Sequence, residues 1–172
     1  MKKLLLFSAF IIFVLASCSN SNKSTIAPTS ASKFSATIDG VHQTFDSKDS
    51  VRLINTAGIY LSGTNDTTSN KILLYIISNT KLDTGTYVST YPAAKSLQLF
   101  YGVGPGYTAD NLYYTYDISQ GASFDGTLTV TSLSSTSIKG TFSGKVVLES
   151  SILTTPQSKT ITDGKFDLSI AQ

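Results

Sequence analysis

The sequence has very few of the residues from which most active sites are built. Its 172 residues include one cysteine, one histidine and no tryptophan. A single cysteine excludes an intrachain disulfide and a metal site made of several cysteines. Charged residues make up only 14% of the chain, against about 25% in an average protein. Beyond the N-terminal segment, no apolar i, i+3, i+4 pattern lasts for ten residues, which excludes a long amphipathic helix there. Serine, threonine, glycine and tyrosine are abundant instead, as is typical of strand-rich exported proteins.

The N-terminus has the layout of a signal peptide. Lys2 and Lys3 precede a run that is apolar except for one serine, residues 4–16. This run is too short to span a membrane, because a spanning helix needs about 20 apolar residues. We therefore predict that residues 1–17 are a cleaved targeting segment.

The end of that segment, Leu15-Ala16-Ser17-Cys18, resembles a bacterial lipobox. The motif needs a thiol because the sulfur receives a diacylglycerol before the peptide is cut in front of the cysteine. We predict lipidation at Cys18 and attachment to the membrane through this anchor. Two or more acyl chains suffice for stable attachment, since each buried methylene contributes about 0.8 kcal/mol.

Residues 18–32 are predicted to be the lipidated cysteine and a flexible Ser-rich tether. The segment is small, polar and without periodicity, and its reach is roughly 20 Å on average. Loss of Lys2 and Lys3 lowers the basic residues from 13 to 11, which equals the 11 acidic ones. A neutral chain argues against a nucleic-acid partner. Residue Ser19 and the lack of acidic residues after Cys18 favour the periplasmic face of the outer membrane over the cell surface.

Residues 33–172 are predicted to form one domain made of strands. Asp39-Gly40 lies between two alternating runs, which indicates a two-residue hairpin. In that register His42 lies opposite Thr37 on the polar face. The opposite face is predicted to be apolar and to hold Phe34, Ile38, Val41 and Phe45.

Turn residues separate many further short apolar or alternating runs. We predict strands at 51–55, 59–62, 72–77, 86–89, 97–101, 112–118, 127–133, 138–148 and 166–170. The run at 72–77 is apolar at every position, which favours a central strand covered on both faces. The expected fold is an all-β, antiparallel β-sandwich of about ten short strands, with a lipocalin-like meander barrel as the alternative.

The order of the short motifs resembles a family of small Bacteroidetes-type lipoproteins that carry one domain of unknown function. These motifs are FSATIDG, GTY, GTLTVTSL, IKGTFSG and ITDGKF, and the resemblance covers about Phe34 to Leu168. Where the family often alternates two aromatic residues, Phe142 is here followed by Ser143-Gly144. The resemblance implies an envelope location and an all-β domain, and it supplies no catalytic residues.

The candidates for catalysis are weak. His42 is the only imidazole, and the predicted register places it on a polar face without a nucleophile. Two Ser-x-x-Lys tetrads, 30–33 and 78–81, fall in the tether and in a turn, whereas the enzymes that use this motif carry it on a helix. Asp163 and Asp167 could contribute oxygens to calcium, but they are interpreted as a turn residue and an outward strand residue. We predict no enzyme activity, no cofactor and no metal site.

The tyrosines are the most informative polar feature. A Gly-Pro-Gly loop is flanked by tyrosines and followed by polar residues. One interpretation is that the tyrosines belong to the core with their hydroxyls at the rim. The other is an exposed surface that stacks on a glycan or an envelope protein. The candidate ligand-binding residues are Tyr101, Tyr107, Asp110, Asn111 and Tyr113.

Two short motifs resemble O-glycosylation acceptors of Bacteroidetes-type secreted proteins. They are Asp49-Ser50-Val51 and Asp66-Thr67-Thr68, and both are predicted to lie in polar turns. The candidate modified residues are Ser50 and Thr67.

The leading functional hypothesis is a lipid-anchored, non-enzymatic envelope protein with a binding or structural role. The alternatives are a lipocalin-like carrier of a small apolar ligand and a glycan-binding module. A closed apolar cavity would distinguish the barrel from the sandwich.

Overall fold

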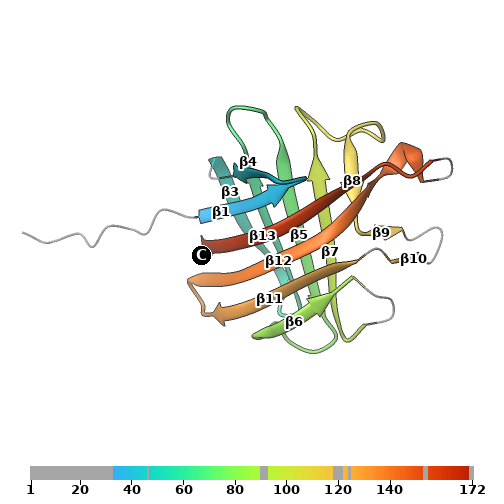
Figure 1. The fold of residues 1–172 in the computed structure, drawn as a ribbon. Helices are drawn as coiled ribbons and strands as arrows, with labels where there is room; N and C mark the ends of the chain where they lie inside the picture. The colour runs from blue at the N-terminus through green and yellow to red at the C-terminus, as the bar shows by residue number, and fades with distance from the viewer. Residues whose placement is uncertain are drawn as a thin grey trace, which may run out of the picture. The chain divides into compact units, whose positions relative to one another are not determined.

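A computed structural model describes residues 33–45, 47–89, 93–117, 122–123, 125–152 and 155–170. The signal peptide, Cys18 and the tether lie outside the described residues. Within these ranges the chain is almost entirely β, with one 3-10 turn at Glu149–Ser151 and no α-helix (Figure 1). The expected all-β domain is therefore confirmed.

Thirteen strands are seen in the described part of the chain. They are β1 (Lys33–Ile38), β2 (Val41–Thr44), β3 (Ser47–Asn55), β4 (Gly58–Thr64), β5 (Lys71–Ser78), β6 (Gly85–Val88), β7 (Lys95–Gly102), β8 (Leu112–Tyr114), β9 (Tyr116–Asp117), β10 (Ala122–Ser123), β11 (Gly126–Leu133), β12 (Ser137–Leu148) and β13 (Ser158–Ser169).

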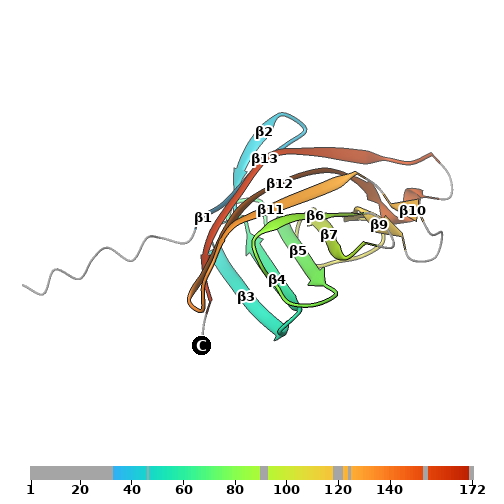
Figure 2. The same cartoon turned by 90° about the horizontal axis from the view of Figure 1, so that it is seen from below.

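Eleven of these strands form one continuous sheet that closes on itself. Its order is β2-β1-β13-β12-β11-β6-β7-β5-β4-β3, and β8 pairs with both β12 and β7. The strands β7, β8, β12, β11 and β6 thus form a closed circuit of five (Figure 2). All pairings are antiparallel except the short contact between β6 and β7. The remaining strands, β9 and β10, pair only with each other.

Two wings extend from the closed circuit. One consists of β5, β4 and β3, and the other of β13, β1 and β2. Figure 1 shows the strands of the two wings crossing in front of one another, with the core between them. The closed circuit favours the barrel alternative over two separate sheets. The connections are not those of a simple meander, because β6 pairs with β11 and β8 pairs with β12, strands that do not follow one another in the chain.

The core lies between these two layers. Phe34, on β1, is at its centre: its ring makes edge contacts with Phe45 at 6.1 Å, Phe142 at 5.6 Å and Phe166 at 6.4 Å between centroids. The other large, fully buried side chains are Tyr87, Ile59, Leu61, Ile72, Leu74, Ile76, Leu97, Leu99, Leu128 and Ile138. Both wings contribute to this set, so burial of apolar surface is what holds them together.

The hairpin at the start of the domain has the predicted register. Ile38 pairs with Val41 and Thr37 with His42 across the Asp39-Gly40 turn. One expectation about it is wrong: Val41 is 62% exposed, not buried. The reason is that β2 ends the sheet, so its first residue extends beyond the opposite layer.

The strand at 72–77 is central, as predicted, since β5 pairs with both β4 and β7. The expectation that it is covered on both faces is wrong. Its burial alternates, with Ile72, Leu74 and Ile76 buried and the residues between them only partly covered. On the outer face the cover comes from neighbouring side chains in the same sheet, because the rings of Tyr60 and Tyr75 stack 4.4 Å apart.

The last strand also differs from the prediction. Asp163-Gly164 was expected to be a turn, but it lies inside β13. The pairing of β13 with β12 shifts there, between Phe142 and Gly144, which marks a bulge. Asp163 takes a left-handed conformation with φ of 51°, which Asp tolerates better than most residues.

The predicted strand at 112–118 is interrupted at Thr115. The backbone N–H of Leu99, on β7, donates to the Thr115 hydroxyl oxygen at 2.9 Å. The hydroxyls of Ser89 and Thr115 lie 3.1 Å apart and are hydrogen-bonded and buried. At Thr115, between β8 and β9, the side-chain hydroxyl therefore accepts the hydrogen bond from β7 that a backbone carbonyl would accept in a regular sheet.

Candidate functional site

Polar bonds close the end of the barrel where the tyrosine loop lies. Tyr101 is only 2% exposed, and Asn70 Nδ2 donates to its hydroxyl oxygen at 2.9 Å. Gln43 Nε2 donates to the same oxygen at 3.3 Å. Burial raises the pKa of the Tyr101 hydroxyl above its usual value. The hydroxyl therefore stays protonated and links β2, the β4–β5 turn and β7.

Asn70 and Asn111 hold the tyrosine loop in place. The Oδ1 atom of Asn70 accepts the N–H of Gly104 at 2.9 Å. The Oδ1 atom of Asn111 accepts the N–H of Thr108 at 2.7 Å, and its carbonyl accepts the N–H of Val103 at 3.0 Å. The side-chain oxygen of Asn111 thus stabilises the turn, and ligand binding by this residue stays a prediction.

The three predicted tyrosines do not form one exposed stacking surface. Tyr101 is in the core, and Tyr113 packs against it with ring centroids 6.3 Å apart. Lys159 covers the Tyr113 ring at 5.3 Å, and Lys71 lies 5.1 Å from the Tyr107 ring centre. Each ring is therefore already engaged, with the cations placed for cation–π contact.

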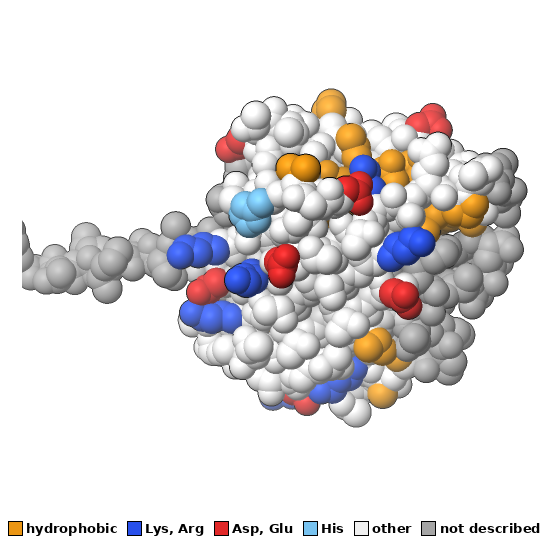
Figure 3. Space-filling view, in the orientation of Figure 1, with side chains coloured by type: hydrophobic (Ala, Val, Ile, Leu, Met, Phe, Trp, Pro, Cys, Tyr) orange, Lys and Arg blue, Asp and Glu red, His pale blue; other side chains and the backbone are white. Residues whose placement is uncertain are grey.

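Two of the predicted ligand-binding residues are exposed at this end, and Asn111 and Tyr113 are partly buried. Tyr107 is 47% exposed and Asp110 is exposed. Figure 3 shows apolar side chains gathered toward the top of the view, where Figure 1 places the β7–β8 loop. Ligand binding by Tyr107 and Asp110 stays a prediction.

A second set of polar bonds lies at the same end, and the one made by Asn65 joins the two wings. Asp39 accepts the N–H of Thr160 at 2.8 Å and pairs with Lys159 at 3.1 Å. Burial alone would raise the pKa of Asp39, but these two partners outweigh it and hold the pKa below its usual value. Asn65 Nδ2 donates to the Thr44 carbonyl at 2.8 Å, which links the β4–β5 turn to β2.

The two candidate glycosylation residues lie in different settings. Thr67 is exposed in the β4–β5 turn, where its N–H donates to Asn65 Oδ1 at 3.0 Å. Ser50 lies within β3, paired with Ser62, so the prediction that it sits in a turn is wrong. The attachment of a glycan to either residue stays a prediction.

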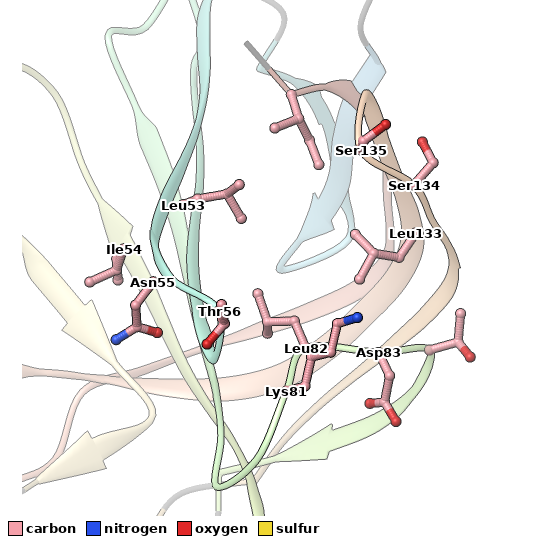
Figure 4. Close-up of a pocket in the computed structure, with 12 residues that line it drawn as sticks. Leu53, Ile54, Asn55, Thr56, Lys81, Leu82, Asp83, Leu133, Ser134 and Ser135 are labelled. Atoms are coloured by element: carbon pink, nitrogen blue, oxygen red, sulfur yellow. The ribbon is translucent and has the colours of Figure 1, made fainter. Parts of the chain in front are cut away.

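The opposite end of the space between the wings is open. A pocket of about 930 Å³ lies there between the β3–β4 turn, the loop after β5, the β11–β12 turn and the end of β13 (Figure 4). Pockets of about 300–1,000 Å³ are typical of small-molecule sites. The residues that line it are Leu53, Ile54, Asn55, Thr56, Lys81, Leu82, Asp83, Thr84, Leu133, Ser134, Ser135 and Ile170.

The interior of this pocket is apolar. Figure 4 shows Leu53, Leu82 and Leu133 directed toward the same space from three different segments. Leu53 is 52% exposed and Ile54 is 42% exposed, although both are large apolar residues. Ile170 lines the pocket as well and is mostly buried. Uncovered apolar side chains grouped in a concave site are the usual sign of a binding site for an apolar group.

Hydrogen bonds fix the walls of the pocket. The N–H of Leu82 donates to the carbonyl of Thr56 at 3.0 Å, which joins the loop after β5 to the β3–β4 turn. The Tyr87 hydroxyl donates to the Asp83 carbonyl at 2.9 Å. On the other wall, the Ser134 hydroxyl oxygen accepts the N–H of Ser137 at 3.0 Å. These bonds fix the turns that form the walls of the pocket.

Asp83, on the rim, is already paired. Its carboxylate forms an ion pair with Lys95, and the hydrogen bond from that ammonium lowers the pKa of Asp83 and raises that of Lys95. Lys95 also lies 5.4 Å from the centre of the Tyr87 ring. Both groups are thus charged at neutral pH and are directed to each other.

The sequence did not predict this pocket. Its walls come from residues between 53 and 170, which local patterns cannot bring together. A usable signal was the pair Leu53-Ile54. Consecutive side chains of a strand point to opposite faces, so in a strand with only one face on the core one of the two is left uncovered. The sequence analysis assigned both only to a short strand.

Other kinds of site find little support in the described residues. No group of three His, Cys, Asp or Glu side chains there could hold a metal ion. His42 is exposed on β2 opposite Thr37, as predicted. No helix among the described residues is long and apolar enough to cross a membrane. Acidic and basic side chains are interspersed on the face shown in Figure 3.

Comparison with known proteins adds no further assignment. No protein-family model, curated protein or solved structure matches this chain. The candidate site therefore depends on the geometry of the pocket alone.

Proposed function

We propose that this protein is an exported, lipid-anchored binding protein of the cell envelope that holds a small apolar ligand in the open pocket. We also propose that it is not an enzyme and that it belongs with the Bacteroidetes-type small lipoproteins it resembles. The observation that carries the binding role is the largely apolar pocket, in which the large apolar side chain of Leu53 is left 52% exposed. Transfer of an apolar ligand into such a site removes apolar surface from water on both partners.

The contrast between the two ends of the barrel supports this role. At one end the wings are joined by Asn65 and Asn70, whose side-chain amides donate to the Thr44 carbonyl and to Gln43 Oε1 on β2. At the other end no comparable polar bridge crosses between the wings among the described residues, and the lining is apolar. The space between the wings is thus open at the end where its lining is apolar, and an apolar ligand bound there would be removed from water.

The position of the first strand fits an anchored carrier. Lys33 pairs with Asp167 near the end of β13, and Ile170, three residues further on, lines the pocket. The proposed tether would therefore join the domain at the end that carries the pocket. A ligand drawn from the membrane would then have a short distance to travel.

The binding role is testable with a neutral apolar dye. The chain from residue 18 onward, with Cys18→Ser to remove the lipid, should bind N-phenyl-1-naphthylamine with a rise in fluorescence. The double variant Leu53→Gln/Leu133→Gln should bind it at least about tenfold more weakly, because two apolar walls become amides. Titration of the dye gives both dissociation constants.

The matched control is Val41→Gln/Val103→Gln, which changes two exposed apolar residues at the closed end. It should bind the dye as the parent does. Circular dichroism should show all three proteins folded, because Leu53, Val41 and Val103 are exposed and Leu133 is only partly buried. Equal dye affinity in both double variants would place the apolar site elsewhere, and no dye binding by the parent would reject the carrier function.

The anchor is tested independently of the pocket. Cells grown with labelled fatty acid should incorporate label into the wild-type chain and not into Cys18→Ser, because the diacylglycerol is attached to the thiol sulfur. The variant should also leave the membrane fraction. Equal labelling of both chains would show that Cys18 is not the lipidated residue.

A further inference from the structure

One cation at the rim is directed into the apolar pocket. Figure 4 shows the side chain of Lys81 rising from the loop after β5, with its nitrogen pointing into the space between Leu82 and Leu133. The ion pairs among the described residues use Lys95, Lys139 and Lys159, so Lys81 has no acidic partner in this part of the chain. Its charge is thus available to a ligand.

The neighbouring acidic group does not cancel this charge. Asp83 is the acidic residue among those lining the pocket, and it is already paired with Lys95. Counting Lys81, Asp83 and Lys95 together, the rim carries one excess positive charge. The pocket therefore combines an apolar interior with a single cation at its entrance.

Two other polar oxygens of the rim, on Asn55 and Ser134, accept hydrogen bonds within their turns. The Oδ1 atom of Asn55 accepts the N–H of Ala57 at 2.7 Å. The hydroxyl oxygen of Ser134 accepts the N–H of Thr136 at 3.2 Å and that of Ser137 at 3.0 Å. A polar ligand head would thus find Lys81 as its strongest partner, and a negative head is favoured over a neutral or positive one.

We propose that the ligand is a fatty acid, with its hydrocarbon chain between Leu53 and Leu133 and its carboxylate at Lys81. This assignment rests on the proposed carrier function and specifies its ligand. The volume of about 930 Å³ is within the range for one small ligand. The geometry thus commits the pocket to a single-chain anionic amphiphile.

The test compares three ligands that differ only in the head group. Dodecanoate, dodecanol and dodecylamine are used to displace N-phenyl-1-naphthylamine from the chain that begins at residue 18 and carries Cys18→Ser. Dodecanoate should compete about three- to tenfold better than dodecanol, because a charge-assisted bond at a partly exposed site contributes modestly. Dodecylamine should compete less well than dodecanol. The advantage of dodecanoate should shrink as salt is raised.

Lys81→Ala should abolish the difference between dodecanoate and dodecanol and leave the affinity for dodecanol unchanged. Lys145→Ala is the matched control, since Lys145 is an exposed lysine of β12 that does not line the pocket. It should keep the full preference. Circular dichroism of both variants should match that of the parent.

The alternative outcomes are separable. Equal competition by the three ligands, unchanged in Lys81→Ala, would overturn the fatty-acid assignment and leave the carrier function standing. No dye binding at all would overturn both. A dimer that is lost in Leu53→Gln/Leu133→Gln and that excludes the dye would show a second copy covering the pocket, which also overturns the assignment.

Discussion

Replacing Phe142 with alanine should lower the free energy of unfolding by about 3–5 kcal/mol, the range for removing a buried aromatic ring. Phe142 is almost fully buried on β12. Its ring packs edge-on against Phe34 at 5.6 Å and lies 6.5 Å from that of Phe166. It also covers Gly164 on the neighbouring strand, where an added Cβ would come within 2.6 Å of the ring. The cavity left behind would therefore face three strands.

Urea unfolding of the chain from residue 18 onward, with Cys18→Ser, measures this loss. The control is Phe100→Ala, which removes the same ring from the outer, half-buried face of β7. Phe100→Ala should lower the free energy of unfolding clearly less than Phe142→Ala, because the ring that it removes buries less apolar surface. A loss below about 1 kcal/mol for Phe142→Ala would mean that the ring does not belong to the core.

A single methyl group at Gly140 should be nearly as damaging. The Cβ atom of Gly140→Ala would overlap the carbonyl oxygen of Thr129 on β11 and lie 2.5 Å from the ring of Phe166 on β13. Because a backbone carbonyl is one of these neighbours, relief requires the pairing of β11 with β12 to shift. We expect a loss of about 3 kcal/mol or more, at the upper end for overpacking.

Gly58→Ala is the matched control for Gly140→Ala, because it adds the same methyl group at a position where no atom is closely packed. The nearest atoms to a Cβ at this position of β4 are side-chain atoms at 3.5 Å and beyond. Its stability should be unchanged or raised by up to about 1 kcal/mol, since alanine restricts the unfolded chain. Unfolding of both glycine variants at the same urea concentration as the parent would contradict the close packing of Gly140 against the Thr129 carbonyl and the Phe166 ring.

Two Asp-Gly pairs show which local structures the sequence predicts and which it does not. Asp39-Gly40 was predicted to form a hairpin turn, and the register around it is correct to the residue. Asp163-Gly164 was predicted to be a turn by the same reasoning, and it is a bulge within β13. Both aspartates have positive φ, so the local preference is the same. The difference comes from β1 and β12, which pair with β13 on either side and keep it continuous.

The candidate sites show the same limit. The Tyr101 hydroxyl is bonded by Gln43 on β2 and Asn70 in the β4–β5 turn, both distant in the chain, so no local pattern could place it in a network. The pocket likewise needs Leu53 and Leu133 to face each other across the two wings. Alternation correctly indicates which residues of a strand share a face. Alternation does not indicate which strand faces pack against each other. The candidate pocket is formed by such long-range packing, so alternation alone cannot predict it.

The pairing of the first strand with the last has a consequence for how the domain folds. β1 is completed only by β13, and the N–H of Thr160 reaches Asp39 across 121 residues of chain. A contact between such distant residues closes a long loop, which is entropically costly and slow. A chain that emerges N-terminus first must hold Phe34 and its neighbours exposed until the final strand arrives. We therefore expect a chain truncated before β13 to lack a cooperative unfolding transition, and complete release of the polypeptide to precede assembly of the barrel.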